Sequence, residues 1–548
     1  MVKSVGSARR GLGLAAGAVL AANLSAAPAA AQYYIGPSSL QVPGVAGGEL
    51  LPAYRGWVRA EGNYWTKRPA RRPIRGISGK ESGMKFTGSQ APEKGPSMLA
   101  ISLAKTSPAL PALMEKCRSG AVLPELRYAE SAEMARHPQE HGPRPADVPE
   151  YYEYVLKGVT LRCPVVADAP EQAFEIGFQQ IEWRNAHRVM DPVPVVAKPA
   201  RLPRAPRSGE TRTFVVSWFA PVADADPHQC ETVNPKPTQD EYYALMSPER
   251  AAQRRAALEK QGGATTVDLP YRGPDEMNVT LLPGIVADPG FIAPKARVVR
   301  GFNLDGDERT GGYVSPEGEK GIDNRLFSVI GCVAGWRKDG FLPMIGNEQR
   351  RAGGLSILVE ISGIDDMRND DDVAVTILYS ADPIRRDGTS KIVLPDFTYR
   401  VNPNPEFSQD FVRFKGRIVN GVIVTDPVPK IYMHEGPAST WSMEQARMRL
   451  EIKPDGTLSA LLGGYRDWRE YVGMAFFMSS DYENTIGFKT PGMYNAVRRA
   501  ADGLKDPYTG EFNGISAAYE MIGVPAFVPP EQQTRLNAGI AMREPARR

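Results

Sequence analysis

The sequence contains few of the residues on which catalytic and metal-binding motifs depend. Its 548 residues include four cysteines and only five histidines, which are scattered at positions 137, 141, 187, 228 and 434. There is no H-E-x-x-H pair, G-x-S-x-G nucleophile turn, Walker phosphate loop or C-x-x-C. These absences argue against zinc peptidases, α/β-hydrolases and P-loop NTPases, and they favour a non-enzymatic protein. A glycosidase-type carboxylate pair stays open, because the sequence gives no distances between its 63 acidic residues.

Strong net charge and long apolar runs are also missing. The formal net charge is only +3, which gives no reason to expect nucleic acid as a partner. Beyond the N-terminal segment, no stretch reaches the roughly 18 apolar residues that a membrane-spanning helix needs. Hydrophobic residues make up 42% of the chain, as in folded globular proteins, and 48 prolines with 53 glycines favour turns and loops over long helices.

The N-terminus has the pattern of an export signal, predicted over residues 1–31. A basic stretch ends at Arg10, an apolar segment of small residues follows at 11–24, and Ala29-Ala30-Ala31 supplies a cleavage site. The mature chain is therefore expected to begin at Gln32 and to be periplasmic, at the cell surface or extracellular. The sequence leaves open whether the general or the twin-arginine route exports it.

Residues 98–183 carry the pattern of a small β-barrel with one short helix. An apolar strand at 98–104 precedes Leu110, Leu113, Met114 and Cys117, which recur at the spacing of a helix face. Long alternating strands are predicted at 151–163 and 174–183, and the first changes phase at Lys157-Gly158, which indicates a bend. Long bent strands around one helix favour a closed barrel.

The order of these elements resembles a known family. The runs LQVPGVAGGELLPAYRGWVRAEGNYW (40–65), ISLAKTSPALPALMEKCRSGAVLPELRYAE (101–130), YYEYVLKGVTLRC (151–163) and FEIGFQQIEW (174–183) are similar to the haemolysin-coregulated protein (Hcp) family of type VI secretion tube subunits. The resemblance covers about residues 33–190 and implies a self-associating ring that stacks into a tube. Two features depart from the family: the export signal, and interruptions at 67–92 and 132–149.

A proline-rich, basic segment at 191–212 is predicted to be a linker after the barrel domain at 32–190. The larger part, 213–527, is predicted to be mainly β with a few helices, as in a β-sandwich or jelly roll. Its hairpin signals are Asn420-Gly421 and the strand pair 447–452 and 457–462. Residues 528–548 are predicted to be a disordered tail.

The four cysteines divide evenly across the linker, and export permits disulfides. Of three possible pairings, the domain boundary favours Cys117 with Cys163 and Cys230 with Cys332. The alternative is that all four are free and buried.

Two acidic loops are candidates for a hard cation such as Ca²⁺, which takes six to eight oxygen ligands. The first is residues 303–308. The second carries the predicted metal ligands Asp365, Asp366, Asn369, Asp370, Asp371 and Asp372. Neither loop has the full EF-hand spacing, so a solvated acidic turn is the alternative.

Together these patterns predict an exported, non-enzymatic structural or assembly protein. Its Hcp-like barrel would carry a β-rich domain that is a cargo or binds a protein or a glycan. The alternative is a protein that binds or hydrolyses an envelope or extracellular polysaccharide, with the barrel as accessory.

Overall fold

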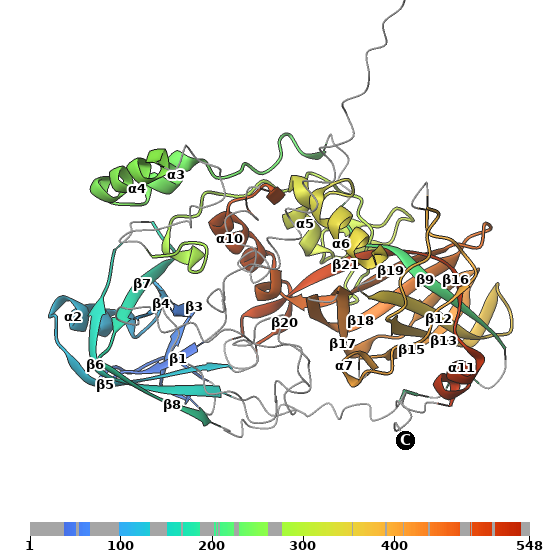
Figure 1. Ribbon diagram of the computed structural model, residues 1–548, viewed down its shortest axis with the longest axis horizontal. Helices are drawn as coiled ribbons and strands as arrows, with labels where there is room; N and C mark the ends of the chain where they lie inside the picture. The colour runs from blue at the N-terminus through green and yellow to red at the C-terminus, as the bar shows by residue number, and fades with distance from the viewer. Residues whose placement is uncertain are drawn as a thin grey trace, which may run out of the picture.

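The computed structural model describes residues 38–50, 54–65, 98–131, 151–165, 168–186, 202–203, 205–206, 209–223, 229–260, 277–352, 355–388, 392–408, 410–436, 439–471, 483, 485–506 and 510–538. The predicted export signal, the two interruptions and most of the linker lie outside these residues. The described chain is mainly β, as predicted, and forms a smaller and a larger β-rich domain (Figure 1). No helix in the described part of the chain is long and apolar enough to cross a membrane.

The smaller domain is a closed antiparallel barrel. Its elements are β1 (Ser38–Gln41), β2 (Val58–Ala60), β3 (Gly62–Trp65), β4 (Met98–Ala104), α2 (Leu110–Arg118), β5 (Leu123–Ser131), β6 (Tyr151–Arg162), β7 (Glu171–Gly177) and β8 (Gln180–Ala186). The strand order is β2-β1-β5-β6-β7-β4-β3, with β8 paired to β6. Only Glu61 separates β2 from β3, so these two strands act as one bent strand that closes the barrel.

The predicted change of phase in β6 is where this strand exchanges partners. Residues 151–157 pair with β8, and residues 160–162 pair with β7. Gly158 lies between the two stretches with φ +61°, a left-handed conformation that glycine adopts without strain. The bend therefore lets one strand serve both halves of the barrel, which confirms the interpretation of Lys157-Gly158.

The barrel has its own hydrophobic core. Leu113 of α2 is 4% exposed and packs with Leu99, Leu126 and Phe174 from three strands. Leu110 and Met114 pack against the same cluster at its margin. The stripe predicted from the helical spacing therefore faces the core.

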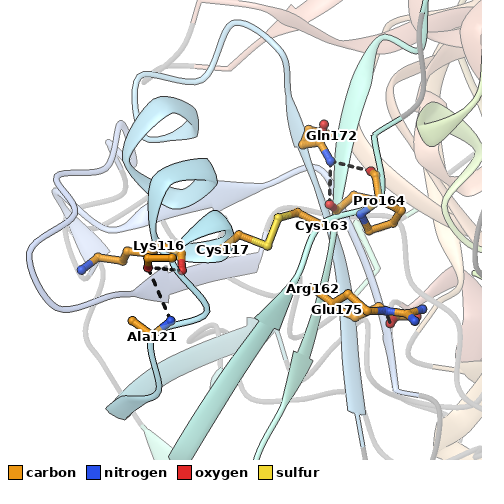
Figure 2. The surroundings of a disulfide bond; sticks show 10 residues. Lys116, Cys117, Ala121, Arg162, Cys163, Pro164, Gln172 and Glu175 are labelled. Carbon is orange, nitrogen blue, oxygen red and sulfur yellow. Dashed lines mark hydrogen bonds and ion pairs between the residues drawn. A yellow bond between two sulfur atoms is a disulfide. The ribbon is translucent and has the colours of Figure 1, made fainter.

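A disulfide joins α2 to the end of β6, as predicted. Figure 2 shows Cys117, in the last turn of the helix, bonded to Cys163, whose Cα lies 6.3 Å away. Beside it the Gln172 side chain donates to the carbonyl oxygen of Pro164 at 2.7 Å. The second predicted disulfide, Cys230–Cys332, also forms, with the two Cα atoms 5.7 Å apart. Each domain therefore has one internal cross-link.

The larger domain is built on one sheet that closes on itself. Its strands are β9 (Glu210–Pro221), β12 (Ser356–Ile364), β13 (Asn369–Ser380), β14 (Phe397–Thr398), β15 (Val412–Val419), β16 (Val422–Thr425), β17 (Val428–Gly436), β18 (Ser439–Ile452), β19 (Leu458–Asp467), β20 (Gly503–Lys505) and β21 (Phe512–Phe527). The order β21-β19-β18-β16-β15-β13-β12-β9 is completed by pairing of β9 with β21, and the sheet is antiparallel except where β14 pairs with β21. This closure is the difference from the expected sandwich, in which two separate sheets pack face to face.

Both predicted hairpins form in this sheet. Asn420 and Gly421 have φ of 52° and 84°, the positive values that a tight turn between β15 and β16 requires. The second hairpin pairs β18 with β19 from Glu444 to Ile452. In both cases a local turn signal in the sequence was sufficient to predict the hairpin.

The larger part of the chain also has helices and a two-stranded ribbon outside the closed sheet. They are α3 (Gln239–Ala244), α4 (Pro248–Lys260), η4 (Pro283–Ile285), β10 (Tyr313–Val314), β11 (Lys320–Ile322), α5 (Arg325–Ile330), η5 (Ala334–Trp336), α6 (Phe341–Arg351), α7 (Pro405–Ser408), α10 (Thr490–Ala500) and α11 (Pro530–Asn537). Figure 1 shows the first two of these helices, α3 and α4, away from the sheet at the upper left, and α10 and β20 on the side of the larger domain that faces the small barrel.

The predicted disordered tail at 528–548 is wrong for its first part, because residues 530–537 form α11. Leu536 of this helix is fully buried in the main core, and its carbonyl oxygen accepts a hydrogen bond from Arg413 of β15 at 3.1 Å. A short polar helix with one anchoring leucine has too weak a periodic signal to be found in the sequence.

Replacing Leu113 with aspartate should unfold the small barrel and spare the larger domain. An unpaired carboxylate in this core would lose apolar contacts and its own hydration, a cost of at least about 3 kcal/mol. Limited proteolysis should then cut within residues 38–186 and leave a resistant fragment of the larger domain. Glu115→Asp, which places the same side chain on the exposed face of α2, is the control. Equal protection of both variants would show that Leu113 does not hold the barrel together.

Candidate binding site at the domain joint

The two domains meet through one face of the small barrel. Tyr64 of β3, Ala100 of β4 and Ala173 of β7 are buried in the same apolar cluster as Leu282 and Ile285 of the larger domain. The Tyr64 hydroxyl oxygen accepts a hydrogen bond from the backbone N–H of Asn278 at 3.1 Å. The barrel is therefore joined to residues 277–286 by a packed apolar contact as well as by the chain.

A buried carboxylate lies at the centre of this joint. The side chain of Glu171, at the start of β7, is 2% exposed and accepts hydrogen bonds from the Tyr494 hydroxyl and from Nη1 of Arg498, the latter at 3.3 Å. Nη2 of Arg498 lies 3.4 Å from Oε2 of Glu61, between β2 and β3. Any side chain at Gly284 would collide with the Glu171 carboxylate. One arginine of α10 thus bridges two acids of the barrel.

The charges at the joint shift one another's pKa. Burial raises the pKa of Glu171, and the nearby charge of Glu61 adds to this, while Tyr494, Ser102 and Arg498 oppose it. Burial together with the Glu171 charge holds the pKa of Tyr494 well above its ordinary value, so the phenol keeps its proton. The neutral phenol and the guanidinium are both hydrogen-bond donors, which is what a buried carboxylate requires.

A cavity of about 250 Å³ opens beside this network, between the domains. It is lined by charged, aromatic and amide side chains from both domains: Arg59, Glu61, Trp468, Arg469, Arg498, Ala501, Glu511, Phe512 and Asn513. Trp468 is nearly buried and packs edge-on against Tyr494, whereas Phe512 is 43% exposed. Domain interfaces are common places for small-molecule sites, and this one offers aromatic surface, cations and carboxylates together.

The three guanidinium groups of the cavity differ in their partners. Arg469 is held by Asp467, with Nε 2.8 Å from Oδ1 and Nη2 2.5 Å from Oδ2. Arg498 pairs with Glu171 and Glu61, as described above. Arg59 lies 3.9 Å from Glu61, and its Nε is buried without a hydrogen-bond partner among the described residues. Arg59 therefore has hydrogen-bonding capacity that the described chain does not use.

A second acidic cluster lies next to the cavity, beyond Ala501. Asp502 accepts the backbone N–H of Ser516 at 2.7 Å and its hydroxyl at 2.6 Å. Burial raises the pKa of Asp502 to about 6; the charge of Asp323 works in the same direction, and Ser516 and Arg325 oppose it. Burial also raises the pKa of Asp323, which accepts the N–H of Leu304 at 2.7 Å. A catalytic mechanism based on two carboxylates would need acids coupled in this way. Here, however, Asp502 and Asp323 both accept hydrogen bonds from backbone N–H groups.

The predicted calcium ligands lie on the β12–β13 hairpin, where Asp370 has a structural role. Its carboxylate accepts backbone N–H groups of Asp365, Asp372 and Asp366 at 2.7, 3.1 and 3.3 Å. Although partial burial acts in the opposite direction, these bonds hold the pKa of Asp370 below its ordinary value. Among the described residues, no three acidic, histidine or cysteine side chains are arranged to hold a metal ion. The calcium site stays a prediction.

The acidic loop at 303–308 is organised in a similar way. Asp305 accepts the Thr310 hydroxyl at 2.7 Å, and Asp307 pairs with Arg309, whose side-chain hydrogen bond holds the pKa of Asp307 low. Local hydrogen bonds within the loop therefore occupy these carboxylates.

Neither the cavity residues nor the pairing of His434 with Asp410 in the larger domain was predicted from the sequence. His434 of β17 is buried with its Nε2 2.8 Å from Oδ2 of Asp410, and the rings of Tyr379 and Phe407 pack against it. Arg59 and Phe512 are more than 450 positions apart and belong to no motif. Only the folded chain brings them together.

Comparison with known proteins gives similarity in structure alone. No family model and no curated protein matches the chain. Hcp1 from Salmonella typhimurium matches with 13% identity over 27% of this chain and 87% of its own, at a TM-score of 0.18. A type VI secretion system effector from Yersinia pestis matches with 9% identity over 28% of this chain and 99% of its own, at a TM-score of 0.15. Both TM-scores lie below 0.5, and the small barrel is defined by its own strand order.

The pH dependence of stability should reveal the buried Asp502. A carboxyl group whose pKa is higher in the folded than in the unfolded chain stabilises the fold below about pH 4, and this contribution is lost as the pH rises through about 6. We therefore expect the free energy of unfolding of the protein to fall, relative to Asp502→Asn, by on the order of 2 to 3 kcal/mol between pH 4 and pH 7.

Urea denaturation of both proteins across this range measures the difference. Asp371→Asn, at an exposed position of β13, is the control and should run parallel to the parent protein. A constant difference between the parent protein and Asp502→Asn would mean that Asp502 titrates like an exposed acid.

Proposed function

We propose that this protein is an exported, non-enzymatic assembly protein related to type VI secretion, with a self-associating Hcp-like barrel and a larger binding or cargo domain. The resemblance of residues 40–183 to the Hcp family motivates the first half of this proposal. The disulfides Cys117–Cys163 and Cys230–Cys332 are compatible with export, because they persist in oxidising compartments. The compartment would be the periplasm, the cell surface or the medium.

The observation that carries the proposal is that the small barrel is complete in itself. Its core is formed by residues between Leu40 and Ile176, and it touches the larger domain through β3, β4, β7 and the turn between β2 and β3. In Figure 1 strands β5, β6 and β8 lie along the lower side of the barrel, and α2 lies on the side away from the larger domain. Those strands could contact other copies while the larger domain stays attached. Ring closure would need two different, complementary faces of this barrel.

A second candidate is a protein that binds or hydrolyses an envelope or extracellular polysaccharide. The cavity at the joint favours it, because Trp468 and Phe512 supply aromatic surface and Glu61 and Glu511 supply carboxylates. Glu61 is already paired with Arg498, so binding is better supported than hydrolysis at this place. This candidate uses the same two domains but places the functional site at the domain joint instead of in a ring of barrels.

The mass of the mature protein in solution tests assembly. Size-exclusion chromatography with light scattering on residues 32–548 and on residues 32–190 should give a multiple of the monomer mass for both at high micromolar concentration. The mass should fall on dilution, as mass action requires. If both species are folded and monomeric throughout, the assembly proposal is wrong and the polysaccharide candidate takes its place.

A further inference from the structure

We infer that Cys117–Cys163 is an exchangeable disulfide, which an external dithiol can reduce, and that its redox state decides whether the whole of helix α2 stays docked on the small barrel. Cys230–Cys332 is, in contrast, a permanent structural cross-link. This inference goes beyond the proposed function, because it concerns how the barrel is completed and holds whether or not the barrel assembles with other copies.

The two disulfides differ in their access to solvent. Cys117 and Cys163 are both partly exposed, whereas Cys230 is 8% exposed and Cys332 is fully buried. Thiol–disulfide exchange begins when a thiolate reaches one of the two sulfur atoms, so access decides which bond can react. An external thiol can therefore approach the pair on the barrel, but it can reach the second pair only after the larger domain opens.

The chain that follows each cysteine of the barrel pair is also open to solvent. Figure 2 shows the bond between the last turn of α2 and the end of β6. Val122, in the connection after α2, is 61% exposed, and Val165, shortly after Cys163, is 70% exposed. The barrel disulfide is thus flanked by exposed chain, and the two valines offer apolar surface that a reducing partner could cover while it reacts.

The disulfide of the larger domain is enclosed by core. Cys230 and Cys332 lie in one buried apolar cluster with Val222 and Phe327. The backbone carbonyl oxygen of Cys332 accepts hydrogen bonds from the backbone N–H and from Nδ2 of Asn234, at 2.8 and 3.1 Å. These contacts would keep the two sulfur atoms close together after reduction, and a pair held in this way re-forms its bond readily.

The barrel disulfide is the main attachment of the C-terminal end of α2. Leu113 is the buried residue of this helix, and Leu110 and Met114 pack at the margin of the barrel core. After Met114 the helix residues are exposed or partly exposed, so Cys117 supplies the covalent attachment of the last turn. Among the described residues, no side chain caps the N-terminus of α2. A helix this short is not stable in water without tertiary contacts, so its last turn depends on the cross-link.

Reduction would proceed by two exchanges with an external dithiol. A thiolate of the dithiol attacks one sulfur of the pair, forms a mixed disulfide and releases the other cysteine as a thiolate. The second thiol of the dithiol then attacks the mixed disulfide, closes the dithiol's own disulfide and releases the second cysteine. Two electrons pass from the dithiol to the protein, and the two thiol protons end on the cysteines.

The reduced barrel would keep its strands and lose the covalent attachment of α2. Its last turn and the connection to β5 could then fray, while Leu113 still holds the first part of the helix on the core. Disulfides persist in oxidising compartments and are rare in reducing ones. The fully docked helix would therefore be the state of an oxidising compartment, and a reducing compartment would hold the barrel in the loosened state.

A redox titration of the mature full-length protein tests the inference. The protein would be equilibrated in mixtures of reduced and oxidised dithiothreitol, its thiols trapped with N-ethylmaleimide, and the state of each cysteine determined by peptide mass mapping. We expect Cys117–Cys163 to be half reduced at a ratio of reduced to oxidised dithiothreitol at least about tenfold lower than Cys230–Cys332, a difference of about 30 mV.

Trypsin reports the state of α2 in the same samples after the reductant is removed. Lys116 and Arg118 lie in its last turn, and cutting there should be at least about tenfold faster once the barrel disulfide is reduced, because proteolysis follows the population of the open segment. Arg127, in strand β5, is the matched control and should be cut equally slowly in both states. Cys117→Ser combined with Cys163→Ser should be cut like the reduced protein, with or without reductant.

Three results would overturn the inference. Reduction of both disulfides at one ratio, or of Cys230–Cys332 first, would show that access does not distinguish the two bonds. Unchanged cutting of α2 in the reduced protein and in the double serine variant would show that the bond exchanges without controlling the helix. Cutting at Arg127 as readily as at Lys116 would mean that reduction unfolds the whole barrel instead of releasing one helix.

Discussion

The arrangement of the two domains depends on one carboxylate that has to be satisfied away from water. Glu171 begins β7 of the small barrel, yet its hydrogen-bond donors, Tyr494 and Arg498, come from α10 of the larger domain. A buried acid without donors would cost several kcal/mol, so separating the domains would either expose it or leave it unpaired. A glycine is needed at position 284 for the same reason, because any side chain there would occupy the space of the Glu171 carboxylate.

This contact also defines the cavity. Arg498 reaches from Glu171 to Glu61, and the bridge fixes the turn between β2 and β3 opposite Trp468. The charged walls are held by ion pairs that the fold makes for its own stability, and Arg59 is left with an unused buried donor. The charges that join the domains therefore also line the space between them.

Local signals in the sequence predicted much of the fold. Lys157-Gly158 marked the bend of β6, Asn420-Gly421 marked a hairpin, and the position of the linker between the cysteines predicted both disulfides. Each of these depends on a few neighbouring residues or on one boundary. The same reasoning placed Leu113 in the barrel core from helical spacing alone.

The rest depends on contacts between distant residues. Pairing of β9 with β21 joins positions about 300 residues apart, as in the hydrogen bond from Trp218 to Glu520, and a strand pattern cannot show whether its sheet will close. In the acidic loop at 365–372, the sequence does not reveal that the carboxylate of Asp370 accepts hydrogen bonds from three backbone N–H groups. The joint and its cavity gave no sequence signal because Arg59, Trp468 and Arg498 meet only in the folded chain.

A double-mutant cycle between Glu171 and Tyr494 tests the central claim most directly. The free energy of unfolding would be measured for the parent protein, Glu171→Gln, Tyr494→Phe and the double variant. If the two side chains hold the domains together by direct contact, their coupling energy should be at least about 1 kcal/mol. Effects that add within about 0.5 kcal/mol would mean that the two groups are independent, and would contradict a docked arrangement built on Glu171.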